Sequence, residues 1–136
     1  MADVRPAYID EHSIRIEAAR DEVWTVLHDY AERLRFTAPW DGVARRLLGT
    51  QPPGGFAIVD EETARLIALD GRHRFARYRL EFDLSVADGA SRLSARSYGD
   101  FPGIHGRAYR AVVVGTRGHV LAVRYMLHTI RRRCTG

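Results

Sequence analysis

The sequence predicts a single α+β domain in which a curved antiparallel sheet wraps around a long C-terminal helix. Residues 78–86 alternate apolar and polar side chains, which is typical of a half-buried strand. Asp-Gly pairs at 70–71 and 88–89 indicate hairpin turns. Arginines recur every seven residues from 110 to 131, close to two helical turns. We expect an apolar ligand cavity between the sheet and this helix.

Length and composition agree with one globular domain covering residues 1–136. Hydrophobic residues make up 46% of the chain and charged residues 28%. All 21 basic residues are arginine, a usage that we attribute to a GC-rich bacterial genome. The net charge is only +4, because 17 acidic residues are interspersed among the arginines. This balance favours a solvated surface and predicts no nucleic-acid partner.

The cysteine content and the ends of the chain predict a cytoplasmic protein. Cys134 is the only cysteine, so no internal disulfide can form. Residues 1–7 lack the apolar run of a signal peptide. The most apolar stretch, 108–127, is interrupted by Arg110, Arg117 and Arg124, which argues against a membrane span.

The N-terminal part predicts a strand followed by a helix. Residues 9–17 alternate, with His12, Ile14 and Ile16 on one face. Asp21 and Glu22 then suit a helix N-terminus, where carboxylates meet the positive end of the dipole. Apolar residues follow at helical spacing: Val23, Leu27, Tyr30 and Leu34, with Trp24 beside them. Pro39 and Gly42 are expected to end this region, and residues 43–48 fit either a short strand or a helical turn.

The middle of the chain predicts a meander of antiparallel strands. The expected strands cover 56–59, 65–69, 72–86 and 91–98. The expected turns between them lie at 60–62, 70–71 and 88–89. Within the last strand Leu93, Ala95 and Ser97 share one face. With the first strand, this makes five strands.

The C-terminal part predicts a helix over residues 103–131. A helix of 30 residues is about 45 Å long and a strand of 15 residues about 50 Å, so each can cover the other. The face opposite the arginines is narrow and consists of Ala108, Val112, Gly115, His119, Ala122, Met126 and Ile130. We expect this face to pack on the sheet.

The order of these elements resembles the SRPBCC superfamily, which includes START domains, polyketide cyclases and birch-pollen-allergen-like proteins. The resemblance rests on the first strand, the helix that carries Asp21-Glu22-Val23-Trp24-x-x-Leu27, the meander and the long last helix. The final segment, Gly106-Arg107-x-Tyr109 through His119 to Met126-Leu127, looks like the tail of an uncharacterised branch. The resemblance implies a helix-grip fold with a ligand cavity. Five strands, where the superfamily usually has six or more, would leave that cavity smaller or more open.

Five residues are the candidates for lining the cavity: Trp24, Tyr78, Phe82, His119 and Met126. Aromatic and methionine side chains suit apolar ligands, although each of them could instead fill the core. His119 is the weak candidate for a catalytic residue, as a hydrogen-bonding group or general base, and its alternative is a core histidine. The six histidines include no pair at metal-binding spacing, so we expect no metal and no cofactor.

The leading hypothesis is a binding or carrier protein for a small apolar ligand, without enzymatic activity, because the sequence contains no complete catalytic set. The second hypothesis is an enzyme of the polyketide cyclase or aromatase kind, in which His119 acts with Tyr78 or Arg77. The third is a protein-interaction module that uses the surface of the helix.

The arginine-bearing face of the C-terminal helix is expected to be partly covered. Val113, Val114 and Leu121 lie close to the arginines by helical rotation, and grouped apolar residues on a surface suggest a contact. The covering element could be a second copy of the chain, the segment 36–53 or a membrane surface. We prefer a homodimer, the commonest assembly.

Overall fold

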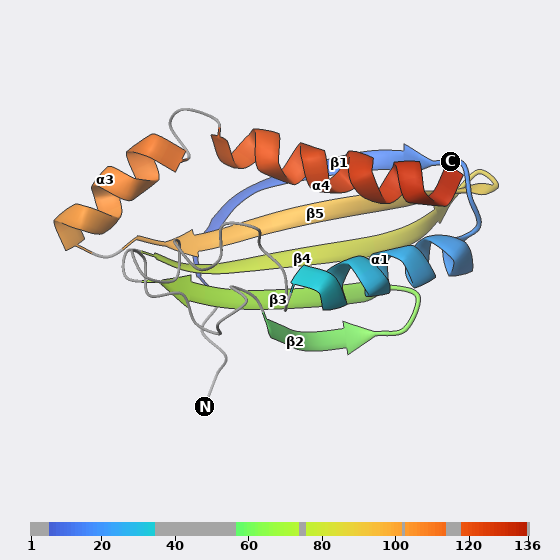
Figure 1. The fold of residues 1–136 in the computed structure, drawn as a ribbon, viewed down its shortest axis with the longest axis horizontal. Helices are drawn as coiled ribbons and strands as arrows, with labels where there is room; N and C mark the ends of the chain where they lie inside the picture. The colour runs from blue at the N-terminus through green and yellow to red at the C-terminus, as the bar shows by residue number, and fades with distance from the viewer. Residues whose placement is uncertain (1–5, 35–56, 74–75, 102, 114–117, 136) are drawn as a thin grey trace.

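The computed structural model describes residues 6–34, 57–73, 76–101, 103–113 and 118–135. Their order is strand, helix, four strands and two helices (Figure 1). The elements are β1 (Tyr8–Ile16), α1 (Arg20–Leu34), β2 (Ala57–Glu62), β3 (Leu66–His73), β4 (Ala76–Ala87), β5 (Ala90–Asp100), α3 (Gly103–Val113) and α4 (Gly118–Thr135). The strands form one antiparallel sheet in the order β1-β5-β4-β3-β2.

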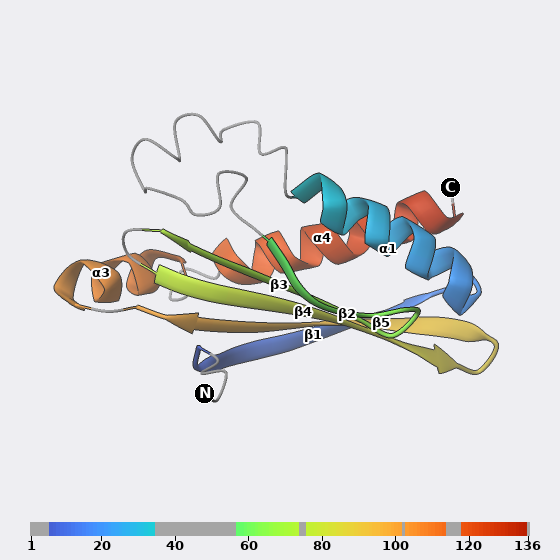
Figure 2. The same cartoon turned by 90° about the horizontal axis from the view of Figure 1, so that it is seen from below.

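The sheet has one face that packs on helices and one that no described element covers. Both α1 and α4 lie on the same side of the sheet, and they also pack on each other (Figure 2). We call this side the inner face and the other the outer face. The core between them is apolar and includes Val23, Leu27 and Ala31 of α1, Val123, Leu127 and Ile130 of α4, and Ile16, Ile67, Leu69, Leu80, Phe82, Leu84, Leu93 and Ala95 of the strands. This arrangement confirms the predicted α+β fold with a C-terminal helix packed on an antiparallel sheet.

The first helix forms where the sequence predicts it. Asp21 and Glu22 occupy its first turn, and Arg33 in its last turn pairs with Asp29 at 3.0 Å. Both arrangements complement the helix dipole. Val23 and Leu27, four residues apart, are fully buried on the side that faces the sheet.

The predicted turn at 60–62 is wrong, because these residues continue β2. The turn lies instead at residues 63–65, where Ala64 has a positive φ of 62°. Glu61 sits opposite Ile67 of β3, on the inner face, and its carboxylate lies 2.9 Å from His28 Nε2 of α1. A charge that is unfavourable in an isolated strand is therefore compensated by a partner on the helix.

The predicted turn at 70–71 is also wrong. Asp70 and Gly71 lie inside β3, opposite Arg79 and Tyr78 of β4. The preference of Asp-Gly for turns is local, and here strand pairing outweighs it. The Asp70 carboxylate lies 3.5 Å from the Arg79 guanidinium on the neighbouring strand. The strand predicted at 72–86 is consequently divided between β3 and β4.

The predicted turn at 88–89 is confirmed. Asp88 and Gly89 have φ of 47° and 79°, and two positive values in a row are the requirement of a tight hairpin turn with the right twist. It joins β4 to β5, the longest pair of strands in the sheet. The segment predicted at 43–48 and the helix stop at Pro39 and Gly42 lie outside the described residues.

The predicted C-terminal helix is two helices, not one. Figure 1 shows that α3 turns away from the axis of α4, and α4 is the C-terminal helix that packs on β1 and β5. Gly115 and Gly118 have low helix propensity, and Gly118 begins α4. Arg110 therefore does not continue the stripe of Arg124 and Arg131, and it lies 5.9 Å from the centre of the Phe101 ring.

The face that α4 presents to the core also differs from the predicted one. Of the predicted face, Ile130 is buried and Met126 is partly buried against the core, but Ala122 is exposed. Val123 and Leu127, which lie outside the predicted face, are also buried. Leu121 is 69% exposed, so the part of the chain that the structure describes does not cover it.

Candidate functional site

The inner face of the sheet changes character along its length. The strand registers align the inner-face residues of β1, β5, β4 and β3 in four rows, and each row crosses three or four of these strands in that order. In order, these rows are Ile14–Leu93–Leu84, His12–Ala95–Phe82–Ile67, Asp10–Ser97–Leu80–Leu69 and Gly99–Tyr78–Gly71. We call the first row, with Ile16 and Ser91 beyond it, the closed end, and the last two rows with His12 the polar end.

The closed end is filled with aliphatic side chains and leaves no polar group unpaired among its described members. Ile16, Leu84 and Leu93 are at most 1% exposed. Ser91 is equally buried, and its hydroxyl donates a hydrogen bond of 2.8 Å to the carbonyl oxygen of Ala18. This is the ordinary condition of a protein interior.

The polar end has small residues around one large ring. Tyr78 lies between Gly71 and Gly99 on the neighbouring strands, and it is only half-buried, whereas Phe82 on the same face is fully buried. A Cβ added at Gly99 would lie 3.0 Å from Ile9 Cδ1 and from the Phe101 ring. The glycine at 99 therefore admits these two side chains close to the sheet.

Three polar side chains also occupy the polar end. His12 Nε2 lies 3.1 Å from Asp10 Oδ2, and both side chains are largely buried. Ser97 lies opposite Asp10 on β5 and is 2% exposed. Its Oγ has no hydrogen-bond partner among the described residues. A buried hydroxyl without a partner is uncommon and calls for an explanation.

A β-bulge between Tyr8 and Asp10 sets this arrangement. It inserts Ile9 into the register, so that Tyr8 pairs with Tyr98 on the outer face while Asp10 pairs with Ser97 on the inner face. Tyr8 is 60% exposed, and its ring packs edge-on against Tyr98 at 5.7 Å. Without the bulge, strict alternation would turn the Tyr8 ring toward the inner face.

The structure places four of the five predicted cavity residues on or against the inner face of the sheet. Phe82 belongs to the core, and Trp24 of α1 and Met126 of α4 are partly buried against the same cluster. Tyr78 lies at the polar end of the inner face. His119 lies in the first turn of α4, and its side chain is outside the described part of the structure.

The pair suggested for a cyclase-like enzyme is not supported at Arg77. Because side chains alternate along β4, Arg77 lies on the opposite face from Tyr78, and it is exposed. The sequence reasoning also missed Asp10, His12 and Ser97 as candidate site residues. A signal existed, because Ser97 shares a predicted face with Leu93 and Ala95, but the bulge beside Asp10 has no clear sequence mark.

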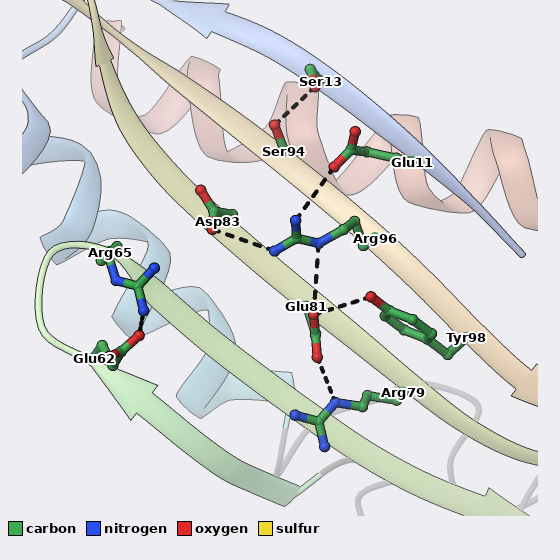
Figure 3. Close-up of polar contacts among 10 residues, drawn as sticks. All are labelled: Glu11, Ser13, Glu62, Arg65, Arg79, Glu81, Asp83, Ser94, Arg96 and Tyr98. Atoms are coloured by element: carbon green, nitrogen blue, oxygen red, sulfur yellow. Dashed lines mark hydrogen bonds and ion pairs between the residues drawn. The ribbon is translucent and has the colours of Figure 1, made fainter. Parts of the chain in front are cut away.

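The outer face carries a network of charged side chains instead of a site (Figure 3). Arg79 Nε donates to Glu81 Oε2 at 2.8 Å, and Arg96 Nε lies 3.6 Å from Glu81 Oε1. Arg96 also approaches Asp83 at 3.4 Å and Glu11 at 3.8 Å. The network thus crosses β4, β5 and β1 and bridges neighbouring strands.

We assign this outer network a structural role. The side chains of Arg79 and Glu81 are each 5% exposed, and buried charges are tolerated when they are paired. Tyr98 donates a further hydrogen bond of 3.3 Å to Glu81, and Ser13 and Ser94 hydrogen-bond across β1 and β5 at 2.9 Å. Arg65 and Glu62 form a separate ion pair beside the β2–β3 turn (Figure 3).

The described residues meet neither the requirements of a metal site nor those of a membrane-spanning helix. They contain no cluster of three or more histidine, cysteine or acidic side chains that would hold a metal ion. None of the described helices combines the length and hydropathy needed to cross a bilayer.

Solved structures share this fold. A protein from Chromobacterium violaceum matches with a TM-score of 0.57 at 13% identity, over 93% of this chain and 96% of that one. CalU16 from Micromonospora echinospora matches with a TM-score of 0.52 at 14% identity, over 91% and 81% of the two chains. Truncated norcoclaurine synthase from Thalictrum flavum matches with a TM-score of 0.52 at 12% identity, over 93% and 95%.

These likenesses confirm the helix-grip fold, an antiparallel sheet with a long C-terminal helix packed on it. Neither a protein-family model nor a curated protein matches the chain by sequence. At identities this low, the likeness concerns architecture and not activity.

Proposed function

We propose that this protein binds a small apolar molecule between the inner face of the sheet and α4, as a carrier or binding protein. The observation that carries the proposal is the polar end of the inner face. There the sheet extends past the close-packed core to Tyr78, a half-buried ring flanked by Gly71 and Gly99. The resemblance to helix-grip proteins implies a ligand cavity between the sheet and the last helix, and aromatic walls suit apolar ligands.

Two of the predicted cavity residues on the helices support the same proposal. Trp24 and Met126 are only partly buried against the core, so the core leaves part of the apolar surface of each side chain uncovered. Met side chains adapt their shape to irregular apolar partners. Such surface would favour an aromatic or polycyclic molecule over a charged one.

The test is a fluorescence titration of the full chain with N-phenyl-1-naphthylamine, a neutral apolar probe that brightens when it leaves water. We expect saturable binding to one site per chain. Tyr78→Ala should raise the Kd about tenfold, because it removes aromatic contact of about 1.5 kcal/mol. The matched control is Tyr8→Ala, which removes an exposed tyrosine from the outer face and should leave the Kd unchanged.

Two results would count against the proposal. One is a linear, non-saturating fluorescence rise in the wild type. The other is an equal loss of affinity in both tyrosine variants, which would place the probe elsewhere. Thermal unfolding of both variants should be recorded first, so that a folding defect is not counted as lost binding.

A further inference from the structure

The three polar side chains of the polar end need an explanation that an apolar ligand alone does not provide. Asp10, His12 and Ser97 lie at neighbouring positions of one face, with Asp10 directly opposite Ser97. Residues diagonal to each other on adjacent antiparallel strands, as His12 and Ser97 are, lie about 7–8 Å apart between their Cα atoms. A single small chemical group can therefore reach all three.

Ser97 is the decisive member, as the other serines of β5 show. Ser91, also buried on the inner face, donates to the Ala18 carbonyl at 2.8 Å. Ser94, on the outer face, is hydrogen-bonded to Ser13 at 2.9 Å. Ser97 is as buried as Ser91 but has no partner among the described residues. Its hydroxyl is available to a ligand.

The Asp10–His12 pair supplies the complementary acceptor. A carboxylate only accepts hydrogen bonds, so the short contact from Asp10 Oδ2 places the imidazole proton on Nε2. In the neutral ring, Nδ1 is then an acceptor, and it makes no hydrogen bond to the described residues. An acceptor at His12 and a donor at Ser97 together match a hydroxyl group, which both donates and accepts.

We propose that Asp10, His12 and Ser97 form a subsite for the hydroxyl group of an otherwise apolar ligand. The ligand class is a phenol or another hydroxylated polycyclic molecule, with its apolar body toward Phe82 and Tyr78. The hydroxyl donates to His12 Nδ1 and accepts from Ser97 Oγ, while Asp10 fixes the tautomer and orientation of the imidazole. This inference rests on the proposed function, since it assigns the polar contacts within the same ligand site.

The experiment compares 2-naphthol, 2-methoxynaphthalene and naphthalene as competitors for bound N-phenyl-1-naphthylamine. We expect the wild type to bind 2-naphthol about tenfold more tightly than its methyl ether, since one well-formed hydrogen bond changes affinity by about that factor. Ser97→Ala and His12→Leu should each reduce this preference to within about twofold and leave the Kd of naphthalene nearly unchanged. Ser94→Ala is the matched control and should retain the full preference.

The outcomes separate the two proposals. Equal affinities for all three competitors in the wild type would overturn the hydroxyl subsite and leave the apolar site standing. A preference for 2-naphthol that survives both Ser97→Ala and His12→Leu would also overturn the subsite. Failure of the probe and of all three naphthalenes to bind would overturn the proposed function and the subsite together.

Discussion

The two ends of the inner face are formed by the same strands but differ in how tightly they are packed and in whether their buried hydroxyl groups are hydrogen-bonded. At the closed end, Leu84 and Leu93 are buried among aliphatic neighbours, and the one buried hydroxyl, of Ser91, is hydrogen-bonded. At the polar end, the equally buried Ser97 has no partner among the described residues, and a half-buried tyrosine lies between two glycines. Under the proposed function, the closed end serves stability and the polar end serves binding.

Stability and binding make different demands on one sheet. Every void and every unsatisfied polar group in a protein interior lowers the free energy of unfolding. A binding site has to keep both until its ligand arrives. A long sheet allows the two demands to be met at separate ends. The close packing of the closed end can then offset the loss of stability at the polar end.

The largest expected effect is at the closed end. Leu93→Ala should lower the free energy of unfolding by about 3 kcal/mol, because it leaves a cavity in a close-packed region. Urea denaturation of the full chain measures the change. The control is Leu121→Ala on the exposed side of α4, which should change stability by less than about 0.5 kcal/mol. A cost above that at Leu121 would instead indicate that a second copy or another partner covers this face.

A smaller effect of opposite sign is expected at the polar end. Ser97→Ala should raise the free energy of unfolding by about 1 kcal/mol, because it removes a buried hydroxyl that has lost its water without gaining a partner. Ser91→Ala, on the same strand and face, should lower it by about 1 kcal/mol, since it removes a satisfied hydrogen bond. If both variants are destabilised alike, the contrast between the two ends is wrong.

The smallest expected effect is the pH dependence of Cys134, in the last turn of α4. Partial burial, and secondly the nearby carboxylate of Glu22, raise the pKa of this thiol above its ordinary value. The raised pKa means that the folded state holds the proton more tightly. The associated stability is therefore present below the ordinary thiol pKa and is lost as the pH rises through the folded value.

Alkylation by iodoacetamide measures this shift, because only the thiolate reacts. At pH 8 the native protein should react more slowly than the protein in concentrated urea, and the pH profile of the native rate should have the higher midpoint. Glu22→Gln should move that midpoint slightly downward. Identical profiles in native and unfolded protein would show that this end of the interior is not closed around the thiol.

The amino-acid pattern alone was enough to locate the elements whose signals are local and periodic. Alternation identified β1 and the greater part of β4, helical spacing with first-turn carboxylates identified α1, and the Asp88-Gly89 turn was correctly located. These signals are reliable because each strand or helix has one face to bury, and the period of the apolar residues reports that face directly.

Tertiary structure decided the features that depend on partners distant in sequence. The sequence of Asp70-Gly71 indicates a turn, but these residues pair with Arg79 and Tyr78 inside the sheet. Glu61 also has the sequence context of a turn, but it continues β2 and pairs with His28 of α1. The C-terminal segment forms two helices, and Val123 and Leu127 of α4, outside the predicted face, also meet the core. For Asp70 and Glu61, a contact with a residue of another element outweighed a weak local preference.

The candidate site belongs to the second group. The sequence placed Ser97 on the face of Leu93, but it did not indicate that this serine would lack a partner while Ser91 would have one. Nor did it show that a bulge would turn Tyr8 outward and leave Asp10 opposite Ser97. Hydrogen-bond satisfaction is a property of the assembled interior, because it depends on which groups of other elements come within about 3 Å.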